Sequence, residues 1–213
     1  MDYMEIDMET YKRKDLFSYF KSMAYPYVGL TVEVDITQFI GNIKKEGAPF
    51  FLSFLYVVCA TANRIPQFRQ RIKEDGIIEY TVCPASYTVA LEEDMYCYCC
   101  LDCSMPFQEF LPYAAEQQRR VIENPVIKDG ENILSYFFIS SVPWTTYTAL
   151  VQPVPFPADS NPRITWGKYF HKDGRTLIPV TILLNHALAD GKQIALFFDY
   201  LSEKLLQPQA LYL

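Results

Sequence analysis

The sequence lacks the features of an exported or membrane-spanning chain. Its N-terminus, MDYMEIDMETYKRK, has no basic segment followed by the apolar run that a secretory signal requires. The most apolar run, Phe50–Ala62, is too short to cross a bilayer and is interrupted by polar residues. With a formal net charge of −6, the chain has no excess of basic residues to attract nucleic acid or anionic membranes. We therefore expect a cytoplasmic protein with neither kind of partner.

Repeats, low-complexity tracts and Gly/Ser linkers are also missing, so nothing divides the 213 residues. Half of the residues are hydrophobic, which is enough to form one large core. The 15 phenylalanines and 16 tyrosines favour a sheet-rich interior with shaped apolar cavities. We expect a single domain over residues 1–213 that binds a small molecule.

Four of the six cysteines cluster at Cys97, Cys99, Cys100 and Cys103, but a metal site is not indicated. A zinc site needs a second cysteine pair or histidines at ligand spacing, and none follows. The Cys100–Cys103 spacing also fits a redox pair, yet no clear helix start follows Cys100. The alternation in MYCYCCLDC instead predicts a strand with reduced, buried thiols, as is usual in the cytosol.

The pattern of apolar residues predicts a mixed α/β fold, with a largely antiparallel sheet flanked by helices. A helix capped by Thr10 is expected over residues 11–23, which would place Arg13 on it. Further helices are expected over residues 35–45, 50–64 and 107–122 and after residue 191. Strands are expected over residues 28–36, 77–82, 86–91, 134–140, 164–170 and 176–184. Asp173-Gly174 predicts a tight hairpin turn between the last two strands.

Only two histidines occur, and their contexts differ. His171 lies in the polar hairpin tip, whereas His186 follows an apolar strand in NHALADG, directly before a helix. A hydroxyl is a poor nucleophile at neutral pH, and an imidazole can take its proton during attack on an acyl group. His186 is therefore a candidate general base, although its position alone fits a packed core residue too.

A signature and four further motifs carry a family resemblance. His186, Asp190 and Gly191 form the H-x-x-x-D-G signature of coenzyme A-dependent acyltransferases. The four further motifs are YKRKDLF (11–17), PQFR (66–69), SSVPW (140–144) and TWGKYF (165–170). Together they resemble the chloramphenicol acetyltransferases in order and separation over nearly the whole chain. The resemblance implies that family's fold and an acetyl-coenzyme A-dependent O-acetyltransferase that acts on a small-molecule alcohol.

The resemblance also implies roles for individual residues. His186 would remove the proton from the acceptor hydroxyl, and Ser140 would donate a hydrogen bond to the oxyanion. Thr165 would hold an ordered water in the same site. As simpler alternatives, Ser140 fits a strand-end cap and Thr165 an ordinary strand residue. The resemblance further implies antibiotic resistance and a homotrimer with three sites at subunit interfaces, whereas the expectation of no metal comes from the cysteine pattern.

Other residues would support the site. The resemblance pairs Arg13 with Asp190, an ion pair that would hold the His186 loop, and Gly191 would provide a tight turn before the helix. The acceptor pocket would include five residues: Phe20, Tyr25, Trp144, Tyr147 and Leu150.

This chain departs from the family pattern at several places, which include Ala24, Pro26 and Leu150 in the drug pocket. Asn185 replaces the first of two adjacent histidines, and strand alternation turns it away from the chemistry. Pro49 stands where a lysine meets the coenzyme A phosphate, so another basic residue, such as Lys44 or Lys45, would have to substitute. Phe20 replaces a tyrosine and Gln152 an apolar residue in the drug pocket, which implies slower turnover of chloramphenicol.

Two alternatives remain open at this point. The same signature occurs in the catalytic core of dihydrolipoyl acyltransferases, although no lipoyl domain or flexible linker is recognisable in the sequence. A catalytically idle protein that binds an aromatic ligand could also retain the cavity.

Overall fold

The computed structural model describes residues 2–125 and 132–212, which contain both helices and strands. The α-helices are α1 (Lys14–Lys21), α2 (Thr37–Lys45), α3 (Phe50–Ala62), α4 (Pro66–Arg69), α5 (Phe107–Glu123) and α6 (Gly191–Leu206). The strands are β1 (Tyr3–Ile6), β2 (Tyr27–Asp35), β3 (Gln70–Lys73), β4 (Gly76–Tyr80), β5 (Ala85–Ala90), β6 (Tyr96–Leu101), β7 (Phe137–Val142), β8 (Arg163–Gly167), β9 (Phe170–Lys172) and β10 (Arg175–Asn185). The described residues also form the 3-10 helices η1 (Ile133–Ser135) and η2 (Pro208–Tyr212).

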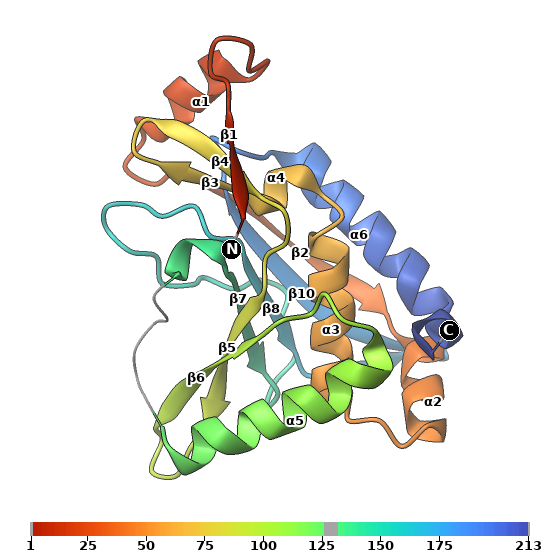
Figure 1. Ribbon diagram of the computed structural model, residues 1–213. Coiled ribbons are helices and arrows are strands. Elements are labelled where there is room, and N and C mark those ends of the chain that lie inside the picture. The colour runs from red at the N-terminus through yellow and green to blue at the C-terminus, as the bar shows by residue number, and fades with distance from the viewer. Residues whose placement is uncertain (1, 126–131, 213) are drawn as a thin grey trace.

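The main sheet has the strand order β2-β10-β8-β7-β5-β6, and β9 pairs with β10. Its β5–β7 and β7–β8 pairings are parallel, and the other described pairings are antiparallel. A small sheet, β1-β4-β3, lies near α1 (Figure 1). The expected α/β class with a mixed, largely antiparallel sheet is confirmed.

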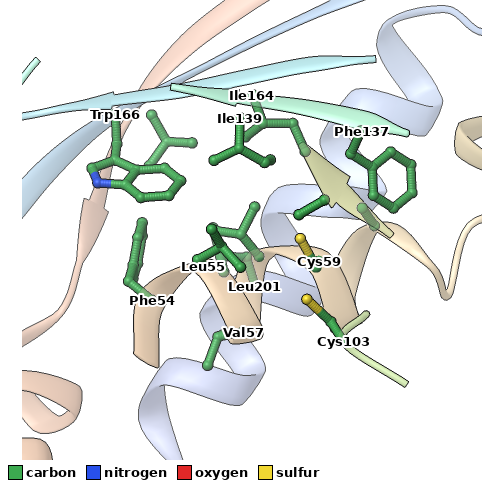
Figure 2. Packing of buried hydrophobic residues seen from close by; sticks show 14 of the residues in the cluster. Phe54, Leu55, Val57, Cys59, Cys103, Phe137, Ile139, Ile164, Trp166 and Leu201 are labelled. Atoms are coloured by element: carbon green, nitrogen blue, oxygen red, sulfur yellow. The ribbon is translucent and has the colours of Figure 1, made fainter. Parts of the chain in front are cut away.

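The helices α3, α5 and α6 cover one face of the main sheet (Figure 1). Helix α3 is apolar on nearly every side, because it lies between the sheet and both other helices. Figure 2 shows Phe54 and Leu55 of α3 facing Ile139, Ile164 and Trp166 of the sheet. Since strand side chains alternate in direction, Ser140 and Thr165 must project from the opposite face.

Several expected boundaries are correct and three are not. Helix α1 begins at Lys14, because the Thr10 hydroxyl donates to Asp7 in a preceding turn instead of capping a helix. Arg13 is therefore the N-cap residue of α1 and not part of its first turns. The strand expected over residues 164–170 splits after Gly167, where the backbone N–H of Lys168 leaves the ladder and donates to Thr145.

The third boundary is the start of β7, which begins at Phe137 because residues 133–135 form a 3-10 turn. Strands β1 and β3 are not expected from the sequence. The hairpin turn is confirmed: Asp173 and Gly174 both have positive φ, as the tightest hairpin loops require. Helix α5 continues through Pro112, which sits near its N-terminus on the exposed side.

The cysteine cluster lies on and just after β6, where Cys97 and Cys99 are buried and alternate with more exposed residues. All six cysteines of the chain are free thiols. In the part of the chain that the structure describes, no helix is both long and apolar enough to cross a membrane.

Candidate active site

His186 lies directly after β10, at the junction with the loop that leads into α6. Its backbone N–H donates to the carbonyl of Pro26 at 2.7 Å. Its imidazole stacks on the ring of Phe20, with centroids 3.8 Å apart and ring planes only 5° from parallel. The Nδ1 atom is buried and has no hydrogen-bond partner among the described residues. The backbone at His186 is thus held by the residue before β2, and its ring packs against Phe20 of α1.

Asn185 anchors the start of the His186 loop. Its side-chain carbonyl accepts the backbone N–H of Ala187 at 3.0 Å, and its amide donates to the carbonyl of Asp159 at 2.9 Å. Ala187 and Leu188 are buried against Phe17 of α1. The asparagine that replaces a family histidine therefore has a defined structural role, because it links the loop to the segment before β8.

Asp190 ends the loop and caps α6. Its carboxylate accepts the backbone N–H of Lys192 at 2.9 Å and the Arg13 guanidinium at 2.7 Å. A capping box with Gln193 completes the helix start. Burial by itself raises the pKa of Asp190, but the hydrogen bonds from Arg13 and Lys192 outweigh it, and the pKa lies below its ordinary value. The ion pair between Arg13 and Asp190 is present.

Gly191 does not have the expected backbone role. It is the first residue of α6 with no positive φ, and an added Cβ would meet nothing within 4 Å. The turn before α6 is instead stabilised by the Asp190 capping interactions.

Ser140 and Thr165 lie side by side on β7 and β8, as directly paired residues of a parallel ladder. Thr165 is buried, and its hydroxyl donates to the side-chain carbonyl of Gln152 at 3.1 Å. The hydroxyl of Tyr147 donates to the backbone carbonyl of Thr165 at 3.1 Å. The two expected neighbours are therefore together on the sheet face that the helices leave uncovered.

Ser140 faces a cavity of about 370 Å³. The cavity is lined by Ser86, Tyr87, Thr88, Tyr98, Ile133, Phe138, Ile139, Ser140, Gln152, Pro153, Pro155, Asp159 and Arg163.

Arg163 is buried and forms a two-pronged ion pair with Asp159, with contacts of 2.7 and 2.8 Å. Tyr27 donates to the same carboxylate at 3.0 Å, and desolvation, followed by that carboxylate, raises the pKa of its phenol. This ion pair has no sequence signal beyond a charged residue at the start of an apolar strand.

His186 does not reach Ser140 within one chain. Thr165 pairs with Thr181 of β10, and His186 follows Thr181 by five residues. At roughly 3.3 Å per strand residue, His186 lies about 16 Å farther along the direction of β10 than the position that pairs with Thr165. Ser140 lies one strand farther away, on β7. One chain therefore presents the base and the hydroxyl donor at two separate places.

The expected pocket residues are also divided between these places. Phe20 contacts His186, and Tyr25 is largely exposed and packs edge-on against Tyr27. Tyr147 lies beside Thr165, whereas Trp144 is 78% exposed. Leu150 is half-buried. None of these five residues lines the cavity at Ser140 within the described chain.

Comparison with known proteins adds to this geometry. The profile of the family "CAT: Chloramphenicol acetyltransferase" matches residues 1–202. The chain belongs to the chloramphenicol acetyltransferase family. A chloramphenicol acetyltransferase of Clostridium perfringens is 31% identical over 209 residues, covering 95% of this chain and 98% of the relative. One of Clostridioides difficile is 30% identical, covering 98% and 99%.

Solved structures show the same fold. A chloramphenicol acetyltransferase superposes with a TM-score of 0.80 at 24% identity, covering 95% of this chain and all of that one. The dihydrolipoamide acetyltransferase of Azotobacter vinelandii superposes with a TM-score of 0.68 at 19% identity, covering 93% and 88%. The acetyltransferase family expected from the four motifs is thus confirmed, and the lipoyl-type alternative has less support.

Proposed function

We propose that this family member transfers the acetyl group of acetyl-coenzyme A to the hydroxyl of a small, partly aromatic molecule in the cytoplasm. The observation that carries the proposal is the fixed His186 ring at a strand end, held by Phe20, Pro26 and the Asp190 loop. A general base must lie within hydrogen-bond reach of the proton that it takes, which a fixed orientation provides.

In the proposed reaction, His186 takes the proton of the acceptor hydroxyl while the oxygen attacks the thioester carbonyl. The buried position of Nδ1 leaves Nε2 as the ring nitrogen that can reach an acceptor. The carbonyl electrons move onto oxygen, where the Ser140 hydroxyl donates a hydrogen bond. Collapse of the tetrahedral intermediate breaks the carbon–sulfur bond, and the imidazolium returns its proton to the departing thiolate. The products are an acetyl ester and free coenzyme A.

The two halves of this site would meet between copies of the chain. Within one chain, His186 lies about 16 Å farther along the sheet than the paired residues Ser140 and Thr165. A second subunit is therefore required to bring the base and the hydroxyl donor together. A cyclic homotrimer, which family membership implies, would form three such sites through one repeated contact. Large apolar side chains are available for that contact: Val151 is 93% and Phe156 92% exposed.

Chloramphenicol is the first acceptor to test, because the relatives carry its name. In wild type, free thiol should be released from acetyl-coenzyme A only when an alcohol acceptor is added. His186→Ala should remove this release. If neither chloramphenicol nor a broad panel of alcohols releases thiol above background, the proposed activity is wrong. Release with dihydrolipoamide but no alcohol would instead support the lipoyl-type reaction.

A further inference from the structure

The side-chain amide of Gln152 lies between Thr165 and the Ser140 cavity. Its carbonyl accepts the Thr165 hydroxyl at 3.1 Å, while its Nε2 is buried without a hydrogen-bond partner among the described residues. Gln152 also lines the cavity together with Ser140. A buried amide donor that lacks a partner costs free energy, and a ligand oxygen that accepts from it recovers that cost.

The contact with Thr165 sets the orientation of the amide. The Thr165 hydroxyl has one proton to donate, and the oxygen of Gln152 is its acceptor. The nitrogen must then point away from Thr165. The other strongly polar group of the cavity, the Arg163 guanidinium, is already paired with both oxygens of Asp159. Besides the Ser140 hydroxyl, which the proposed reaction uses, Gln152 is therefore a donor that the cavity offers to a ligand.

The local sequence keeps Gln152 in place. It precedes Pro153 in the run VQPVPFP, where three prolines alternate with other residues. Proline fixes its own φ and restricts the residue before it to extended conformations. The backbone of this segment thus has little freedom to withdraw the amide from the cavity.

The amide is also near the proposed reacting centre. Ser140 and Thr165 are paired on neighbouring strands about 4.8 Å apart. Adding the 3.1 Å contact and the width of an amide places Nε2 within roughly 10 Å of the Ser140 hydroxyl. An acceptor whose reacting hydroxyl lies beside Ser140 would place only its nearby substituents against Gln152.

We propose that Gln152 is a specificity-determining residue of this enzyme, an inference that rests on the proposed function. Its Nε2 donates a hydrogen bond to a second oxygen of the acceptor, a few atoms from the hydroxyl that is acetylated. The preferred substrate class is then alcohols with a nearby carbonyl or hydroxyl oxygen, and alcohols with a plain hydrocarbon chain are disfavoured.

Two matched probes test this preference: 3-hydroxy-1-phenylpropan-1-one and 3-phenylpropan-1-ol. They share a phenyl ring and a primary hydroxyl, and differ in one carbonyl oxygen that can only accept hydrogen bonds. Wild type should favour the ketone in kcat/KM by roughly tenfold, as expected for one buried hydrogen bond. Gln152→Leu should bring the ratio near one. Gln152→Glu, which keeps the shape but replaces the donor by an acceptor, should favour the plain alcohol.

The control is Gln38→Leu, the same substitution on the exposed surface of α2, which should keep the wild-type ratio. Where a probe is not turned over, its inhibition constant against chloramphenicol acetylation provides the same ratio. Equal ratios in wild type and Gln152→Leu would overturn the role of Gln152 while leaving the acetyltransferase intact. Absence of thiol release with every alcohol, chloramphenicol included, would overturn the proposed function itself.

Discussion

Arg13 and Asp190 are 177 residues apart in sequence, yet their side chains form an ion pair with a nitrogen–oxygen distance of 2.7 Å. Arg13 occupies the N-cap position of α1 and Asp190 caps α6, so the pair joins the starts of these two helices beside the His186 loop. Because both groups are partly buried, removal of one leaves the other without its partner.

The first prediction is that Arg13 and Asp190 are energetically coupled. Arg13→Ala and Asp190→Ala should each destabilise the fold, while the double variant should lose less than the sum, with a coupling of about 1 kcal/mol. Denaturant unfolding of the four proteins measures this. The more exposed ion pair between Lys21 of α1 and Asp75 of the β3–β4 turn serves as a control and should show weaker coupling. Strict additivity at Arg13 and Asp190 would mean that the contact has no energetic weight.

The second prediction concerns how the stability contributed by Asp190 changes at acidic pH. The pKa of Asp190 is lower in the folded protein than its ordinary value, so its charge stabilises the fold above the unfolded pKa of about 3.9. That contribution is lost as pH falls through the folded pKa. Asp190→Asn keeps a helix cap but removes the charge. The stability difference between wild type and this variant should be constant from neutral pH to about pH 5 and shrink below pH 4. A difference that grows in acid would contradict this assignment.

The third prediction tests the general base. His186→Ala should reduce kcat by ~10²-fold or more and leave the unfolding transition almost unchanged. The matched control is His171→Ala, because His171 lies on the exposed β9–β10 hairpin and is the chain's other histidine. Equal losses in both variants, or more than a tenth of wild-type activity in His186→Ala, would rule out the proposed mechanism.

The fourth prediction separates binding from catalysis at Ser140. A hydrogen bond that strengthens in the transition state affects kcat more than KM, so Ser140→Ala should lower kcat by ~10²-fold with little change in KM. Ser141→Ala, one residue along the same strand and on its other face, should have a small effect on both. An effect of Ser140→Ala on KM alone would indicate a role in substrate binding.

The sequence predicts the helices and strands whose apolar residues follow a clear periodicity. It does not predict those elements whose existence or boundaries depend on tertiary contacts. The apolar run of α3 and the Asp-Gly turn before β10 were readable because each pattern suits one structure. Strands β1 and β3 are short, and each exists because it pairs with β4. The start of α1 was misplaced because Thr10 binds Asp7, a local competition that helix propensity does not include.

The candidate site shows the same division. The order of the motifs identifies His186, Ser140, Thr165 and Asp190 as candidate site residues. Strand spacing alone does not reveal that His186 and Ser140 lie far apart along the sheet. The ion pair of Asp159 with Arg163 depends on the path of the proline-containing segment before β8. Such loop paths have no periodic signal, so only the folded chain reveals these contacts.

The last prediction is that activity requires two chains at each site. His186→Ala and Ser140→Ala subunits should each be inactive alone. When the two are refolded together in equal amounts, a site between neighbours regains function wherever one chain supplies His186 and the next supplies Ser140. Random assembly in a closed ring gives about a quarter of the sites this composition, so about a quarter of wild-type activity should return. Sedimentation should show trimers in every sample. As a control, mixing His186→Ala with a variant that lacks both groups should restore nothing. Mixed trimers without recovered activity, or a fully active monomer, would show that His186 and Ser140 do not form a site between subunits.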